Sequence, residues 1–302
     1  MLTLDFKTER SKDCILIDAT KWVQNRSNMV QQYRLSGRDV ITYIAEVLDT
    51  NLVNPEFKGK VKKGDYVLLS RVVSEVSQYR TYGIDGDNKY FNVPFMQIMG
   101  VFENRVISYN AFTPLFNKVL AVPFTPKKEG QFVEGITNKA TIGKVLKTGR
   151  CRFNEAWERE PMKTSYGDTI LIKDNMTTNI KLDGKDYYLL EEESVVCILD
   201  DLTYSLDDAE FINKSILLQN YVPEKLLGSS ILYTPNINYE DLDYTDIYNK
   251  NQMRVCHADL TLTQVKENDI IFIDRNVASY VYYEDQKYYV VNGLDYIEGK
   301  LT

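Results

Sequence analysis

The chain has 302 residues, 44% of them hydrophobic, which is enough for one large domain or for two to three ordinary ones. A net charge of −7 with scattered Lys and Arg argues against nucleic-acid binding through clustered phosphate contacts, and no apolar run reaches the roughly 18 residues that cross a membrane. The four cysteines lie far apart without metal-ligand spacing, so we expect buried, reduced thiols, no metal and no cofactor.

In chain order, the apolar runs fall into three similar sets. Each set starts with an apolar run that ends in a polar or Pro-containing break. These first runs begin at Cys14, Lys118 and Lys214. After a stretch with little periodicity comes a second run, beginning at Asp39, Thr141 and Gln252. The recurrence indicates an internal repeat of about 100 residues.

A turn followed by an alternating apolar run marks the middle of each set. The turn residues are Gly64, Gly167 and Asn268, separated by 103 and 101 residues. A Tyr-aromatic pair follows each turn further along the chain. The pairs are Tyr90-Phe91, Tyr187-Tyr188 and Tyr288-Tyr289. Such near-equal spacing is rare in unrelated turns, so it supports the repeat.

The alternation with period two, together with many Tyr, Val and Ile residues, predicts strands and hairpins. Hairpin turns are expected at Asp85-Gly86, Asp183-Gly184 and Glu284-Asp285. Helical signals are scarce, and a helical turn at a unit junction is expected in a few short stretches such as the segment that begins at Leu206. The prediction is an all-β chain of three small tandem β-barrels, with units at 1–109, 110–206 and 207–302.

The order of these motifs resembles the GroES family of co-chaperonins. The second copy carries the resemblance most fully: "KVLAVPFTPKKEGQFVEGITNKATIGKVLKTG" (118–149) has Gly143-Lys144-Val145 at the family's "GxV" position and Gly167-Asp168 at its "GD" turn. The first copy keeps "VKKGD", whereas the third has Asn268 in place of Gly and "RVCHAD" in place of the "GxV" pattern. The resemblance implies a GroES-like barrel for each unit.

Members of that family cap a chaperonin ring through a mobile loop after the first strand, which carries a short apolar motif. The resemblance therefore implies partner-binding residues in the corresponding loops. The candidates are Ile231, Leu232 and Tyr233 in the third copy, Phe132 and Val133 in the second, and Met29 and Val30 in the first. Only the third loop has the full pattern. The alternative is that all three are ordinary surface loops whose apolar residues pack back on their own unit.

The sequence contains no motif for catalysis. His257, the only histidine, has no Ser, Cys or Asp motif nearby that would form a triad, and a satisfied or surface histidine is the simpler interpretation. The "IDGDNKY" stretch lacks most of a calcium loop and is better read as a hairpin turn. We therefore expect a protein that is not an enzyme.

Two functions remain, together with a generic oligomeric scaffold as a third. Three unequal loops argue against capping, because a cap repeats one weak contact around a ring to gain avidity. The usage of Asn, Tyr, Lys and Asp resembles that of tailed phages of gut bacteria, among them crAss-like phages. The leading hypothesis is thus a multi-copy auxiliary virion protein that binds a capsid or portal lattice and is assembled in the host cytoplasm. The alternative is a cytoplasmic co-chaperonin-like cap of a chaperonin ring.

Overall fold

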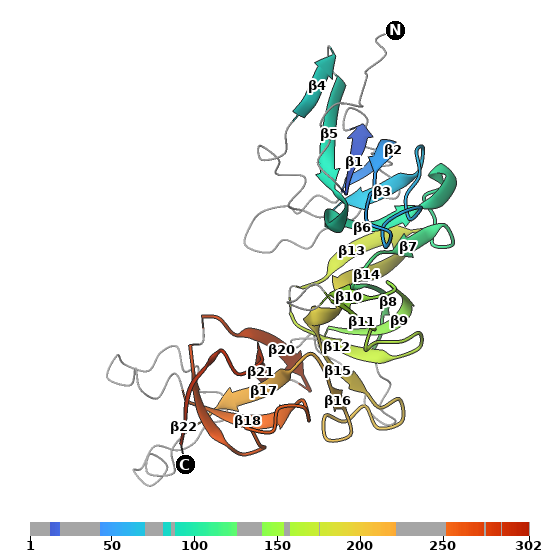
Figure 1. Ribbon diagram of the computed structural model, residues 1–302. Coiled ribbons are helices and arrows are strands. Elements are labelled where there is room, and N and C mark those ends of the chain that lie inside the picture. The colour runs from blue at the N-terminus through green and yellow to red at the C-terminus, as the bar shows by residue number, and fades with distance from the viewer. Residues whose placement is uncertain are drawn as a thin grey trace. The chain divides into compact units, whose positions relative to one another are not determined.

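The structure is a computed structural model, and it describes residues 13–18, 43–69, 81–85, 88–125, 141–153, 158–174, 176–221, 252–274, 276–284 and 286–301. These residues form an all-β chain with three separate antiparallel sheets (Figure 1). The predicted fold class is therefore confirmed.

The first sheet contains β1 (Cys14–Asp18), β2 (Tyr43–Asn51), β3 (Tyr66–Leu69), β4 (Thr81–Asp85), β5 (Asn88–Pro94), β6 (Ile98–Phe102) and β7 (Phe112–Pro114). Short 3-10 turns, η1 (Phe95–Gln97) and η2 (Glu103–Arg105), flank β6.

The middle sheet contains β8 (Lys118–Pro123), β9 (Ile142–Thr148), β12 (Thr169–Ile172), β13 (Thr178–Leu182), β14 (Lys185–Glu191), β15 (Val195–Leu199) and β16 (Glu210–Phe211). The 3-10 turn η3 (Glu192–Ser194) links β14 to β15, and β10 (Arg152–Phe153) pairs separately with β11 (Arg159–Glu160). The third sheet contains β17 (Ser215–Asn220), β18 (Gln252–Ala258), β19 (Ile270–Ile273), β20 (Ser279–Tyr283), β21 (Gln286–Asn292) and β22 (Ile297–Leu301).

The three sheets share one strand order. It runs β4-β5-β1-β2-β3-β6-β7 in the first, β13-β14-β8-β9-β12-β15-β16 in the middle and β20-β21-β17-β18-β19-β22 in the third. β7 pairs with β6 and β16 pairs with β15 at one edge of their sheets, and each lies in sequence just before the first strand of the next sheet. Among the described residues, no strand pairs with the outer edge of β22.

The three turn residues occupy the same place in their sheets. Gly64, Gly167 and Asn268 all have positive φ, of 90°, 94° and 68°, which suits Gly and Asn. The amide of Gly64 donates to Val47 O at 2.8 Å, and the corresponding acceptors are Val145 O at 2.9 Å and Val255 O at 2.8 Å. The spacing in the sequence thus reflects one repeated backbone arrangement.

The β13–β14 hairpin also forms as predicted. Its turn is Asp183-Gly184, where both residues have positive φ, as a two-residue hairpin of the twisted type requires. The helical turn expected from Leu206 was wrong, because the described chain there makes turns and then enters β16. Ser205 Oγ accepts the amide of Asp207 at 3.2 Å, and this side-chain bond favours a turn over a helix.

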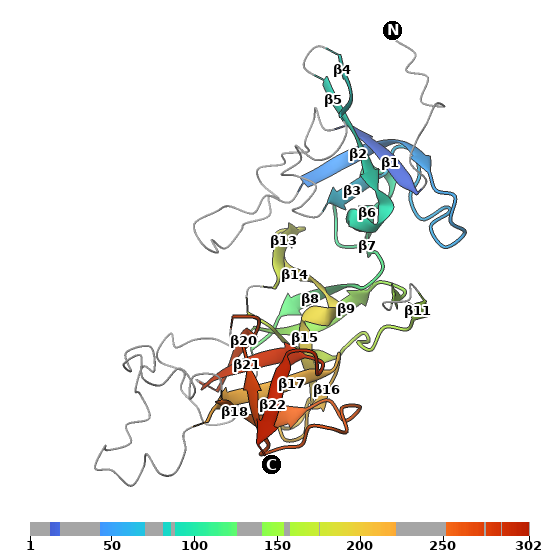
Figure 2. The ribbon, with the colours of Figure 1, turned by 60° about the vertical axis from the view of Figure 1, so that its left-hand side comes forward.

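The chain forms two compact units, and the middle sheet contributes to both. One unit comprises Met1–Pro123, Lys144–Gly167 and Thr177–Glu192, and the other comprises Phe124–Gly143, Asp168–Met176 and Glu193–Thr302. Within each unit the terminal sheet has a core of its own. The core of the first sheet includes Ile15, Ile17, Val67 and Val93. Figure 2 shows the third sheet, in which β21 lies between β20 and β17.

Each unit also has a second core, which joins two sheets. In the first unit, Leu68, Phe102 and Phe112 pack with Leu182 and Leu189 of the β13–β14 hairpin. In the second unit, buried residues of the middle sheet pack with the β20–β21 hairpin. The contributors are Leu171, Val196, Cys197, Leu199 and Phe211 on one side and Val281, Tyr283 and Val290 on the other. Neighbouring sheets therefore share buried apolar surface, which is the main source of stability in such contacts.

Candidate functional site

The loops expected to bind a partner all leave from the same place in the strand order. They connect β1 to β2, β8 to β9, and β17 to β18, which are neighbouring antiparallel strands. The middle loop is closed at its base by Phe124 N donating to Ile142 O at 2.9 Å. In the third sheet, Tyr221 N donates to Gln252 O at 3.2 Å. Each loop thus starts and ends on adjacent strands of a buried sheet.

All seven predicted partner-binding residues lie outside the described residues. These are Met29, Val30, Phe132, Val133, Ile231, Leu232 and Tyr233. The structure therefore describes only the ends of the loops that carry these residues.

A buried lysine lies beside the base of the middle loop. Ile172 N donates to Thr141 O at 2.9 Å, and the next residue, Lys173, is 8% exposed. Its Nζ donates to Glu193 O at 2.9 Å and to Asn292 Oδ1 of the third sheet. Burial lowers the pKa of Lys173 to about 8, although Glu193 acts in the opposite direction. This lysine links the base of one loop to the next sheet, a connection the sequence did not reveal.

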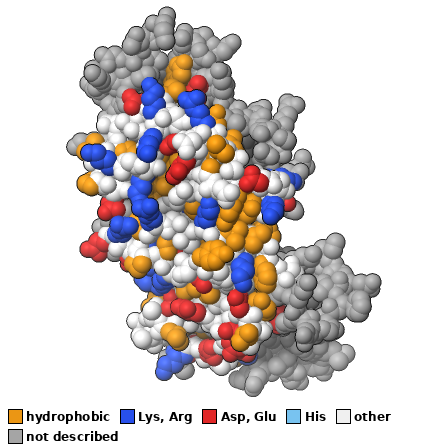
Figure 3. All heavy atoms as spheres, turned by 90° about the vertical axis from the view of Figure 1, so that its right-hand side faces the viewer, with side chains coloured by type: hydrophobic (Ala, Val, Ile, Leu, Met, Phe, Trp, Pro, Cys, Tyr) orange, Lys and Arg blue, Asp and Glu red, His pale blue; other side chains and the backbone are white. Residues whose placement is uncertain are grey.

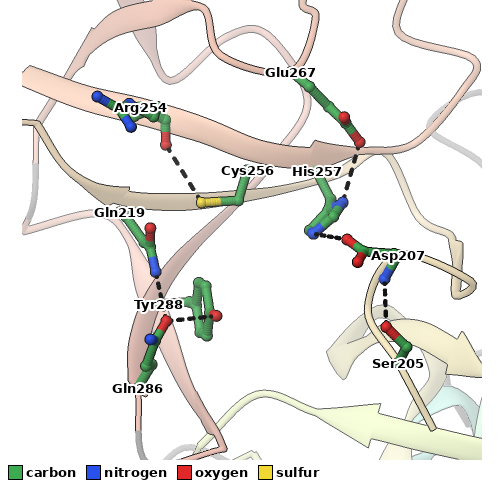
Figure 4. Close-up of polar contacts among 9 residues, drawn as sticks. All are labelled: Ser205, Asp207, Gln219, Arg254, Cys256, His257, Glu267, Gln286 and Tyr288. Atoms are coloured by element: carbon green, nitrogen blue, oxygen red, sulfur yellow. Dashed lines mark hydrogen bonds and ion pairs between the residues drawn. The ribbon is translucent and has the colours of Figure 1, made fainter. Parts of the chain in front are cut away.

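A second polar cluster surrounds His257 (Figure 4). His257 Nδ1 lies 3.1 Å from Glu267 Oε1, and Nε2 lies 3.6 Å from Asp207 Oδ1. The imidazole also stacks on Phe211 of β16, with ring centroids 5.2 Å apart. The expectation of a satisfied histidine agrees with this geometry. The neighbouring thiol, Cys256 Sγ, donates instead to Arg254 O, with the two atoms 3.9 Å apart, as the dashed line in Figure 4 marks.

The contact between the first and middle sheets has a polar rim. Tyr109 stacks on Tyr187 at 5.5 Å, and its amide donates to Asp183 Oδ2 at 2.8 Å. Lys147 Nζ donates to Tyr109 O at 2.6 Å and to Phe112 O at 2.8 Å. Burial lowers the pKa of Lys147 and raises that of Tyr187. The chain around Asn110 is thus held by stacked rings and by the partly buried ammonium group of Lys147.

A cavity of about 300 Å³ lies in the same unit. Three phenylalanines, Phe57, Phe95 and Phe116, line it and contact one another with centroids 5.0 to 5.4 Å apart. Arg159 and Glu56 also line it and form an ion pair at 3.0 Å. The cavity thus lies between aromatic residues at the edge of the first core and charged side chains.

The described residues offer little for metal or redox chemistry. Within them, no group of three or more His, Cys, Asp or Glu side chains is placed to hold a metal ion. Cys14, Cys151 and Cys197 are buried thiols, and burial raises the pKa of Cys256 to about 11. No helix in the described part of the chain is long and apolar enough to cross a membrane. On the face shown in Figure 3, basic and acidic side chains are interspersed.

Comparison with known proteins identifies the middle part of the chain. The family model described as "Chaperonin 10 Kd subunit" matches residues 112–199, from β7 to the end of β15. The co-chaperonin GroES of Desulforapulum autotrophicum is 31% identical over 91 residues, which cover 29% of this chain and 96% of that protein. GroES of Syntrophomonas wolfei is 32% identical over 80 residues, covering 26% and 83%, and GroES of Myxococcus xanthus is 32% identical over 74 residues, covering 24% and 77%.

The family match runs through the second predicted copy, in which Gly167 makes the positive-φ turn and Asp183-Gly184 closes the hairpin. The chain covers between 77% and 96% of the length of these three relatives. Through residues 112–199, the chain belongs to the chaperonin 10 kDa subunit family, the GroES co-chaperonins.

Proposed function

We propose that the chain is a non-enzymatic, cytoplasmic binding protein of the co-chaperonin type, whose partner is a chaperonin ring. The observation that carries the proposal is the family match over 112–199, which includes the strands that bound the middle loop. The relatives that match are named co-chaperonins. This favours the cap that the sequence suggested as its alternative.

The proposal extends to the sheets on either side. The first and third sheets are diverged copies of the matched unit, with units at 1–109, 110–206 and 207–302. Support comes from the shared strand order and from the turns at Gly64, Gly167 and Asn268. The contact with the ring is then made by the loops between the first and second strands.

The third loop is the strongest candidate for this contact. It carries Ile231, Leu232 and Tyr233 after Gly228, and the middle loop adds Phe132 and Val133. Short apolar segments of this kind bind by placing a few side chains into a hydrophobic groove of the partner. Unequal loops on one chain imply unequal contributions, with the third loop largest.

Binding of the purified chain to a chaperonin ring in the presence of ATP tests the proposal. Replacing Ile231, Leu232 and Tyr233 by Ser removes the apolar contacts, and we expect affinity to fall at least tenfold. Leu202→Ser is the matched control, because Leu202 is 90% exposed on a turn and its loss leaves the loops intact. Unchanged binding of the triple variant refutes the role of the third loop. Absence of binding by the wild-type chain refutes the function itself.

The virion role stays a prediction from composition. Neither the family match nor the relatives support a capsid or portal partner. Mass spectrometry of phage particles would find the chain if that prediction is right.

A further inference from the structure

The contact between neighbouring sheets is built twice from corresponding positions. The strands β6, β15 and β22 each carry a β-bulge. There the register with the paired strand, which is β3, β12 or β19, shifts by one residue. The bulged residue is Met99 in the first sheet and Val196 in the middle sheet, and these are 8% and 0% exposed. Both belong to the cores shared with the next sheet. An apolar residue at the bulge is thus part of the contact.

The third sheet has the same bulge but a different residue in it. The bulged position is Glu298, and it is exposed. Beside it, Phe272 pairs with Gly299 as Leu68 pairs with Gly100. Phe272 is only half-buried, whereas Leu68 is 1% exposed. The surface that would receive a further sheet is therefore present but interrupted by a carboxylate.

A second polar residue lies on the same surface. Ile44 pairs with Leu68 in the first sheet and packs against the shared core. Gln252 holds the corresponding position, paired with Phe272, and is half-buried. Two of the apolar positions of the contact are thus polar or charged in the third sheet.

The β4–β5 hairpin of the first sheet differs from the two hairpins that take part in the contact. Leu189 and Val290, each paired with the first strand of its sheet, are 0% and 1% exposed in the shared cores. The corresponding residue in the first sheet is Asn92, which pairs with Leu16. Its Oδ1 is buried without a hydrogen-bond partner among the described residues. An amide at this position opposes burial against another sheet.

The residue types at the turn ends of the three hairpins also differ. Leu182 and Tyr283, which close the β13–β14 and β20–β21 hairpins, are 2% and 4% exposed in the shared cores. Asp85 holds the corresponding register position at the end of β4. Tyr90 keeps the aromatic type found at Tyr187. By register alone, the first hairpin thus has Asp85 and Asn92 at the positions that Leu182 and Leu189 hold in the β13–β14 hairpin.

We infer that this sheet-to-sheet contact is used twice in the chain and is then terminated at both ends by polar residues. Burying Glu298 or Asp85 in such a contact would require desolvation of a carboxylate. Repeat proteins end in the same way, with terminal units whose outer faces are polar. The chain is a finite array of three sheets that does not extend head to tail through this contact.

A pair of variants tests the inference in the full-length chain. The first variant carries Gln252→Ile and Glu298→Val, which restore the accepting surface. The second carries Asp85→Leu and Asn92→Leu, which restore the hairpin. We expect each variant alone to have the same mass as the wild type in light scattering after size exclusion, and the mixture to form a complex of twice that mass.

Two results would overturn the inference. One is a mixture that stays at the mass of its parts although both variants melt as cooperatively as the wild type, because the polar residues would then not be what terminates the contact. The other is a wild-type assembly that dissociates when Glu298 or Asn92 is replaced by Lys, because the contact would then be in use. The measurement requires no chaperonin, so its outcome is independent of the proposed function.

Discussion

Replacing Gly100 by Ala should destabilise the chain, because β7 fills the space above this glycine. A Cβ built on Gly100 would lie 2.4 Å from the ring of Phe112 and 3.0 Å from Thr113 O. Phe112 is fully buried, and its ring lies 4.8 Å from that of Phe102. The ring therefore has no free space into which to move. Gly299 holds the corresponding position in the third sheet, where the nearest atom, on Phe272, is 3.7 Å away.

The two substitutions should change the free energy of unfolding in opposite directions. Overpacking a buried site costs about 1–3 kcal/mol, and removing a glycine from the unfolded chain returns about 0.4–1 kcal/mol. For Gly100→Ala, the free energy of unfolding should thus fall by about 1–2 kcal/mol. For Gly299→Ala, only the second effect operates, and the free energy of unfolding should rise by up to about 1 kcal/mol.

Urea unfolding followed by circular dichroism measures both variants against the wild type. The double variant Gly100→Ala with Phe112→Leu tests the cause, because a smaller side chain at 112 should reduce the penalty of the added methyl group. Equal effects of Gly100→Ala and Gly299→Ala would refute the reasoning. So would a double variant whose loss is the plain sum of the two single losses.

Three further predictions concern the stability of the chain and the reactivity of its thiols. Gly149→Ala should destabilise more than Gly100→Ala, since its Cβ would lie 1.8 Å from the backbone oxygen of Phe116; equal urea midpoints would contradict this. Between pH 8 and 10 the ammonium group of Lys173 keeps its proton in the unfolded state but loses it in the folded state. The free energy of unfolding of the wild type should therefore rise with pH relative to that of Lys173→Met, by at most about 3 kcal/mol. Parallel pH profiles of the two proteins would count against this prediction. A thiol reagent at pH 8 should label the native chain slowly, and rapid labelling of Cys197, whose pKa burial raises, would be inconsistent with its position.

The sequence predicted the all-β class, the three turns and the middle hairpin well. Gly64, Gly167 and Asn268 were recognisable because a positive φ restricts the residue type, and each turn precedes the same strand. The hairpin at Asp183-Gly184 follows from the same restriction. Such local rules act within a few residues and can be read without the fold.

The contacts between sheets could not be read in this way. Met99 and Val196 look like ordinary core residues in the sequence, and their β-bulges become visible only when strands are paired. The neighbours of His257 and Lys173 are likewise distant in the chain, as with Asn292, which lies 119 residues from Lys173. Long-range pairs of this kind leave no periodic signal. The partner-binding residues depended on family resemblance alone, and they remain predictions.

Competition for a chaperonin ring tests the central claim most directly. A fluorescently labelled GroES is bound to the ring with ATP, and the purified chain is added in increasing amounts while the bound fluorescence is measured. If residues 112–199 make this chain a co-chaperonin, it should displace the labelled protein in a saturable manner, and the variant with Ser at Ile231, Leu232 and Tyr233 should displace it less well. Retention of all the labelled GroES at saturating amounts of the wild-type chain would contradict the proposed function.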